Sequence, residues 1–102
     1  MSDSQVKFRD TIIRNFFDAN GKLKAIPGQK KKKLVIFEYL ISKLNPEQQY
    51  TEKEGNAFIK QHHEDFCTIR REFIIHGFIF MDRNESMYSI NPKQEWKKWE
   101  EL

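Results

Sequence analysis

The fold of this chain is decided by the stretch EDFCTIRREFIIHGFIF, which occupies residues 64–80 of 102. Its apolar residues recur at steps of three and four, the spacing that places them on one face of an α-helix. We predict a helix over residues 64–76, ended by Gly77, and a strand over residues 78–81. The side chains that this helix should bury are Phe66, Ile69, Phe73 and Ile74.

Three further helices precede this stretch. Amphipathic spacing predicts them over residues 3–17, 29–44 and 51–61. The last of them begins with Thr51 and Glu54, which have the spacing of a capping box. Its inward side chains are expected to be Phe58 and Ile59, and those of the helix before it Leu34, Phe37, Leu40, Ile41 and Leu44.

Two short strands and a C-terminal helix complete the prediction. Residues 22–26 alternate between polar and apolar, and residues 87–90 follow a tight turn as the partner strand of a hairpin. Asn91 and Pro92 predict the start of a last helix, with Asn91 as its cap. One side of that helix carries Trp96, Trp99 and Leu102. These aromatic residues could complete the core, or the two terminal helices could form the seam of a homodimer.

This order of elements predicts an α+β fold, a winged helix-turn-helix with extra N- and C-terminal helices. In a winged helix the third helix of the core enters a DNA groove and the hairpin forms the wing. We expect one domain over residues 1–102, with an N-terminal helix (1–17), a winged-helix core (22–91) and a C-terminal helix (92–102).

Charge is distributed unevenly along the chain. Residues 22–43 contain seven lysines and one glutamate, a net charge of +6, whereas residues 47–65 sum to −3. Lysines at the start of a helix oppose its macrodipole, so this block suggests contacts with phosphates or an acidic partner. A solvated helix start is the alternative. The candidate nucleic-acid-binding residues are Lys30, Lys31, Lys32, Lys33, Thr68, Arg71 and Arg83.

The helix over residues 64–76 also carries features that argue against DNA. Glu64 and Asp65 occupy its first turn, where a groove-reading helix contacts base edges and where carboxylates repel phosphates. Asp65 is expected to cap the helix. Arg70 has an alternative structural role, in which it pairs with Glu52 or Glu54 and joins two helices.

No constellation in the sequence indicates catalysis, a metal or a cofactor. His62, His63, Cys67 and His76 lack the paired spacing of a metal site, so we expect core or surface roles for them. Cys67 and His63 lack an orienting third group and a glycine-rich loop, which disfavours a thiol nucleophile. One cysteine excludes an internal disulfide framework, and no apolar run is long enough to span a membrane. The N-terminus does not resemble a secretory signal, so a cytoplasmic protein is expected. Because no catalytic constellation is present, we expect it not to be an enzyme.

Several motifs together resemble a bacterial family of domains of unknown function, numbered two-zero-eight-seven. They are KAIP with Lys30 to Lys33, YTEKE with Asn56, Asp65, IRREF, GFI, Asp82-Arg83 and Tyr88, and they cover residues 17–90. The resemblance implies a winged-helix-like fold in a regulatory setting and no established activity. The family-typical polar residues are Lys30, Lys32, Tyr50, Glu52, Glu54, Asn56, Asp65, Arg70 and Arg71. Gly55 stands where the resemblance implies an apolar residue.

Two functions remain open at this point. The first is a transcriptional regulator that binds double-stranded DNA, suggested by the winged-helix order and the basic block. The second is a protein-interaction or effector-sensing module on the same scaffold, suggested by the acidic start of the presumed reading helix and its mixed charges. In the second case Tyr50, Glu52, Glu54, Asn56, Asp65 and Arg70 would have structural or interaction roles, and the partner would be a regulatory protein.

Overall fold

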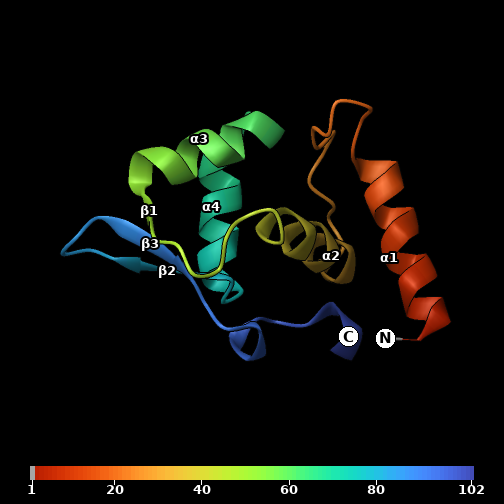
Figure 1. Cartoon of the computed structure of the whole chain (residues 1–102). Helices are drawn as coiled ribbons and strands as arrows, with labels where there is room; N and C mark the ends of the chain where they lie inside the picture. Colours follow the sequence, from red (N-terminus) through yellow and green to blue (C-terminus); the bar gives the residue numbers. More distant parts are fainter. Residues whose placement is uncertain (1) are drawn as a thin grey trace.

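The computed structural model describes residues 2–102, which form four α-helices and a three-stranded antiparallel sheet (Figure 1). The elements are α1 (Asp3–Phe16), α2 (Lys30–Ile41), β1 (Tyr50–Thr51), α3 (Glu52–His62), α4 (Phe66–Ile75), β2 (Ile79–Asp82) and β3 (Met87–Ile90). Two short 3-10 turns follow, η1 (Lys93–Glu95) and η2 (Trp99–Glu101). The α+β class predicted from the sequence is therefore confirmed. No helix in this part of the chain is long and apolar enough to cross a membrane.

Helix α2 forms the centre of the core. It lies between α1 and α4 (Figure 1), and its apolar side chains are buried on nearly every side. Phe37 meets Phe73 of α4 with ring centroids 5.4 Å apart, and Ile12 of α1 is only 5% exposed. The residues of α2 that are buried are Leu34, Val35, Ile36, Phe37, Leu40 and Ile41. Two of these, Val35 and Ile36, were missed because a one-sided helical stripe was expected.

The sheet has the strand order β1-β3-β2, with the β2–β3 hairpin extending away from the helices (Figure 1). Tyr88 of β3 pairs with Tyr50 on one side and with Met81 on the other. The hairpin strands lie within one residue of their predicted positions, and the β3 bounds are as predicted. Strand β1 was not predicted, because two residues are too short to show an alternating pattern.

Helix α3 begins with the predicted capping box. The Glu54 amide donates to the Thr51 hydroxyl at 3.0 Å, and the Glu54 carboxylate accepts from the Thr51 amide at 2.8 Å. Gly55 lies against the ring of Tyr88, and a Cβ atom added there would lie 3.1 Å from Tyr88 Cδ2. The absence of a side chain at this position thus lets α3 approach β3 closely.

The predicted strand over residues 22–26 is absent. Its place is taken by a single bridge between Phe17 and Leu23. The Leu23 amide donates to the His62 carbonyl at 2.7 Å, and the Lys24 amide donates to the Phe16 carbonyl at 2.8 Å. The segment is therefore attached to the ends of two helices, and neither end offers a ladder on which a strand could extend.

The predicted C-terminal helix is also wrong. Residues 92–102 form the two 3-10 turns η1 and η2, separated by extended backbone at Trp96 and Lys98. Asn91 does not cap a helix, because its Nδ2 donates to the Gly77 carbonyl at 2.9 Å. Trp96 packs on Phe78, whereas Trp99 stacks on the ring of Phe8 of α1. A straight helix cannot supply both contacts, so the chain extends between them.

Two apolar residues lie outside the core against expectation. Ile74 is 44% exposed and Leu102 is 50% exposed. Helix α4 is only ten residues long and buries Ile69 and Phe73. Ile74 lies about 100° around the helix from Phe73, at the edge of the buried stripe, and no neighbouring described element covers it there.

The C-terminal segment packs closely against Gly77, so a side chain added at Gly77 should destabilise the protein. Gly77 has φ +80°, and an added Cβ would lie 2.6 Å from the Glu95 carbonyl oxygen. Gly21 is a matched control, with φ +82° and nothing within 4 Å of the added Cβ. We expect Gly21→Ala to cost about 1–2 kcal/mol of unfolding free energy from positive φ alone. Gly77→Ala should cost at least about 1 kcal/mol more, because the clash is with backbone. Urea unfolding of both variants measures the difference, and equal costs would contradict the packing of the C-terminal segment.

Candidate nucleic-acid interface

Helix α4 presents its polar face because its two buried residues point into the core, where Phe73 packs on Phe37 of α2. Asp65 caps the helix by accepting from the Thr68 amide at 3.4 Å, as predicted. Ile69 and Phe73 are 0% and 1% exposed. Arg71 lies on the opposite side of α4 and is exposed. Thr68 is half-buried, so it is less accessible to a ligand than Arg71. Asp65, one turn before Thr68, is exposed.

Arg70 joins α4 to α3. Its Nη1 donates to Asn56 Oδ1 at 3.1 Å and lies 3.6 Å from Glu52 Oε1. The pairing of Arg70 with Glu52, expected as its structural role, is therefore present. The guanidinium also faces Tyr88, where burial raises the pKa of the phenol and the charge of Arg70 opposes that rise. We call Glu52, Asn56 and Arg70 the α3–α4 clamp.

The other family-typical polar residues in this region also stabilise the fold. Glu54 completes the capping box of α3, and Asp65 caps α4. The Tyr50 hydroxyl accepts from the Asn45 amide at 2.9 Å and so holds the segment after α2. The polar residues that begin and join α3 and α4 are thus occupied within the chain.

A hollow of about 420 Å³ separates α4 from the hairpin. Arg71 lines it together with exposed apolar side chains of the same helix, Ile74 and Ile75. Met81 and Tyr88 form its hairpin side. Arg71 makes no hydrogen bond or ion pair with any of residues 2–102, so its guanidinium is available to a ligand.

The lysine block lies beside α4 but is only partly available. Lys33 Nζ lies 3.6 Å from Glu72 Oε1, a contact that joins the start of α2 to α4. Lys31 Nζ lies 4.9 Å above the ring of Phe8. Lys30 and Lys32 have no ion pair within the described residues.

Arg83 occupies the turn of the hairpin. It is exposed and has no ion pair with another described residue. The turn is held by Asp82, whose Oδ1 accepts from the Asn84 amide at 3.0 Å, and by Ser86, which has φ 55°. The hairpin contains one basic residue, Arg83, and two acidic residues, Asp82 and Glu85, so its net charge is negative.

The histidines and the cysteine are not brought together into one site. His62 Nδ1 lies 3.0 Å from the Phe58 carbonyl, and His63 Nδ1 accepts from the Asp65 amide at 3.0 Å. His76 Nε2 lies 2.7 Å from Glu72 Oε2, far along α4 from the exposed Cys67. Within residues 2–102, no group of three or more His, Cys, Asp and Glu side chains could hold a metal ion.

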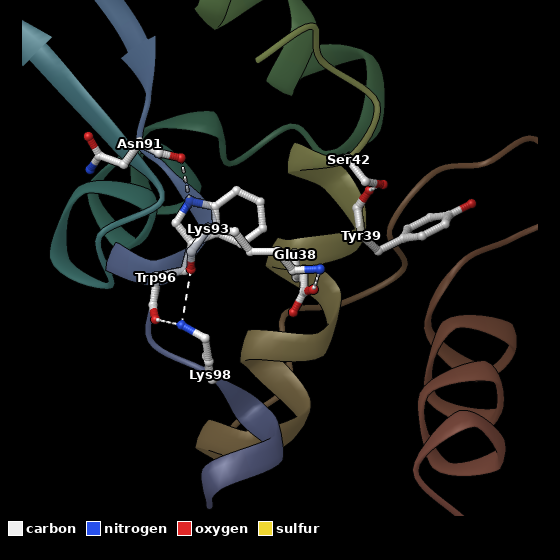
Figure 2. A network of polar contacts seen from close by, with 7 residues as sticks. All are labelled: Glu38, Tyr39, Ser42, Asn91, Lys93, Trp96 and Lys98. Atoms are coloured by element: carbon white, nitrogen blue, oxygen red, sulfur yellow. Dashed lines mark hydrogen bonds and ion pairs between the residues drawn. The ribbon is translucent and has the colours of Figure 1, made fainter. Parts of the chain in front are cut away.

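A polar cluster at the C-terminal segment was missed by the sequence reasoning. Figure 2 shows Glu38 of α2 facing Lys93, whose Nζ lies 3.6 Å from Glu38 Oε1. Lys98 Nζ donates to the carbonyls of Lys93 and Trp96 and holds the turn closed. Burial is the main cause that raises the pKa of Glu38, and the nearby charge of Glu100 raises it further. The signal in the sequence was a single carboxylate inside the apolar run LVIFEYLI.

A comparison with known protein families identifies the family of this chain. Residues 22–90 match the model of DUF2087, described as "Uncharacterized protein conserved in bacteria". The chain belongs to this family. The match confirms the resemblance noted in the sequence, and it includes the α3–α4 clamp, Arg71 and Arg83. Nothing among the curated proteins or the solved structures matches the chain significantly.

The two adjacent arginines of α4 should respond differently to substitution. Arg70→Ala removes a charged hydrogen bond and an ion pair between helices, so we expect it to lower the unfolding free energy by about 1–2 kcal/mol. Arg71→Ala removes an exposed side chain without partners and should change it by less than about 0.5 kcal/mol. Thermal or urea unfolding compares them directly. A larger cost for Arg71→Ala than for Arg70→Ala would refute this division of roles.

The raised pKa of Glu38 predicts a pH-dependent stability. The native state binds a proton at Glu38 more readily than the unfolded chain, for which the ordinary value is 4.5. The contribution of this group to the unfolding free energy therefore falls as the pH rises from the unfolded pKa through the native one. We expect the unfolding free energy of Glu38→Gln, relative to that of the parent protein, to be higher at about pH 7 than at about pH 4. Urea unfolding of both proteins at the two pH values measures this. A difference in unfolding free energy between variant and parent that is the same at both pH values would contradict the prediction.

Proposed function

We propose that this protein is a winged-helix transcriptional regulator that binds double-stranded DNA through α4, the β2–β3 hairpin and the start of α2. The order α2, β1, α3, α4, β2, β3 and the sheet order β1-β3-β2 support this assignment, since a winged helix has three helices followed by a hairpin. On this proposal α4 is the groove-reading helix and the hairpin is the wing.

One observation carries the proposal. The α3–α4 clamp occupies Arg70, while the adjacent Arg71 is exposed and unpaired among the described residues, beside a hairpin whose turn carries Arg83. A rigidly held helix with an outward arginine next to a β-ribbon can place one guanidinium at base edges and another at the backbone.

The lysine block would supply phosphate contacts beside α4. Lys30 and Lys32 are unpaired within residues 2–102, and Lys31 keeps its ammonium at the surface above Phe8. Lys33 is engaged with Glu72, so a phosphate would have to compete with that carboxylate. Thr68 is half-buried near the start of α4, where its hydroxyl can donate to a phosphate.

A second function, binding of a regulatory protein on the same face, is favoured by a different observation. Ile75 of α4 is 66% exposed and Ile74 is 44% exposed, and both line the hollow beside Arg71. Large apolar side chains in exposed positions mark interaction surfaces. Glu64 and Asp65 at the start of α4 also repel phosphates and would suit a protein partner. The alternative of a homodimer through the terminal helices has less support, because α1 and Trp99 pack on the chain's own core.

The salt dependence of DNA binding tests the first proposal. With about four phosphate contacts, the affinity should fall by about 100-fold between about 50 and 200 mM salt. Fluorescence anisotropy with a labelled duplex of mixed sequence measures this. Arg71→Ala and Arg83→Ala should each weaken binding, and each should lower the salt slope by about 0.9 for every phosphate that the arginine neutralises. Lys7→Ala, on the outer surface of α1, is the matched control and should bind like the parent protein.

The outcomes separate the two functions. Absence of duplex binding even at low salt would exclude the DNA proposal. If all three variants weakened binding equally, the binding would be non-specific attraction to a basic protein and not recognition by α4. In either case the exposed Ile74 and Ile75 would make a protein partner the better assignment for this face.

A further inference from the structure

A second hollow lies on the other side of α2, away from the proposed DNA-binding face. It has a volume of about 370 Å³ and is formed by α1, α2 and the C-terminal segment. Volumes of this size accommodate small organic ligands. Its lining residues are Arg9, Asp10, Ile13, Val35, Glu38, Tyr39, Ser42, Lys93 and Trp99.

The hollow has an apolar floor and a carboxylate at one end. Ile13, Val35 and Trp99 form the floor, but Val35 and Trp99 are each 1% exposed, so the apolar surface that a ligand can reach belongs mainly to Ile13 and to the ring of Tyr39, which also line the hollow. The Glu38 side chain is 20% exposed, so its carboxylate is partly withdrawn from water at the edge of this floor. An apolar floor with a few convergent polar groups is the usual composition of a ligand site.

Negative charge at this end of the hollow is in excess. Glu100 lies close enough to Glu38 for its charge to raise the pKa of that carboxyl, in addition to the larger effect of burial. Lys93 and Trp99 oppose the rise by charge and by hydrogen bonding. Glu100 Oε1 is buried and has no hydrogen-bond partner among residues 2–102. Among residues 2–102, the one ion pair that offsets the charge of Glu38 is the pair with Lys93.

The Lys93 side chain can move away from Glu38 at little energetic cost. Lys93 is 69% exposed, lies on the short turn η1 and reaches Glu38 only at 3.6 Å (Figure 2). An exposed ion pair of this length contributes little to stability, so displacing it costs little. A ligand cation would contact the same carboxylate and, in addition, the accessible apolar surface of Ile13 and Tyr39.

We propose that this hollow binds a small organic amine, with the ligand ammonium at Glu38 in place of Lys93 and its apolar part against Ile13 and Tyr39. The opposite charge is disfavoured, since an anion would face Glu38 and Asp10. The cation Arg9 is already 3.2 Å from Asp10. This site does not depend on the proposed DNA binding, because α2 separates it from α4.

Ligand titration followed by NMR tests the site on the whole chain. The probe is 2-phenylethylamine, and 3-phenylpropanoate is the control of similar shape and opposite charge. The indole N–H of Trp99 reports on the hollow, while that of Trp96, which donates to the Asn91 carbonyl, is an internal reference. We expect a saturable shift of the Trp99 signal with the amine only.

Two substitutions give opposite expected effects. Glu38→Gln removes the anion and should weaken amine binding by about tenfold or more, the effect of losing one charged hydrogen bond. Lys93→Ala removes the competing ammonium and should tighten binding by several-fold. A merely structural role of Lys93 cannot produce tighter binding. Glu47→Gln, on the exposed segment after α2, is the matched control and should bind like the parent protein.

The proposal is overturned by any of three results. These are a Trp99 signal that does not saturate with the amine, equal binding of the carboxylate probe, or a Lys93→Ala variant that binds no more tightly than the parent. If Glu38→Gln failed to fold, as judged from the Trp96 signal, the exposed Lys93→Ala variant would still decide the question.

Discussion

The burial of α2 is the constraint on which the rest of the structure depends. Each fully buried aliphatic or aromatic side chain contributes about 1.5–3 kcal/mol, and α2 buries apolar residues toward α1, α4 and the C-terminal segment. The T-shaped contact of Phe37 with Phe73 orients α4, and the packing of Trp99 brings the C-terminal segment over α2. Both proposed sites are therefore built on opposite sides of one helix.

The orientation of α4 shows how much of the candidate site could be predicted from the sequence. The helix, its Asp65 cap and the outward Arg71 follow from local spacing, because capping and i, i+3 or i, i+4 relations are set within one or two turns. The Arg70–Glu52 pair joins residues 18 positions apart on two helices, so opposite charges in the sequence offered it only as an alternative role. The exposure of Ile74 does not follow from spacing. An apolar residue at the edge of a helical stripe is buried only if a neighbouring element covers it.

The elements that could not be predicted are those shaped by contacts between distant segments. Strand β1 exists because Tyr50 and Thr51 pair with β3, about forty residues later, and two residues carry no pattern of their own. The C-terminal segment has good helical signals in Asn91 and Pro92, yet Asn91 donates to Gly77 and the two tryptophans pack on different partners. Tertiary contacts therefore override a local preference that is worth little by itself.

The start of α2 gives the clearest physical argument about function. Gln29 makes no side-chain cap, no acidic residue lies in the first turn, and Lys30 begins a run of four cations at the positive end of the helix dipole. Each such cation costs about 0.3–1 kcal/mol, a cost that the buried apolar residues of α2 offset. Only Lys33 has an ion-pair partner among the described residues. Lys31 lies over the ring of Phe8, whereas Lys30 and Lys32 have no ion pair among the described residues and a neutral residue would suit the helix better. This favours a role for Lys30 and Lys32 outside the chain, and phosphate is the ligand that suits cations at a helix N-terminus.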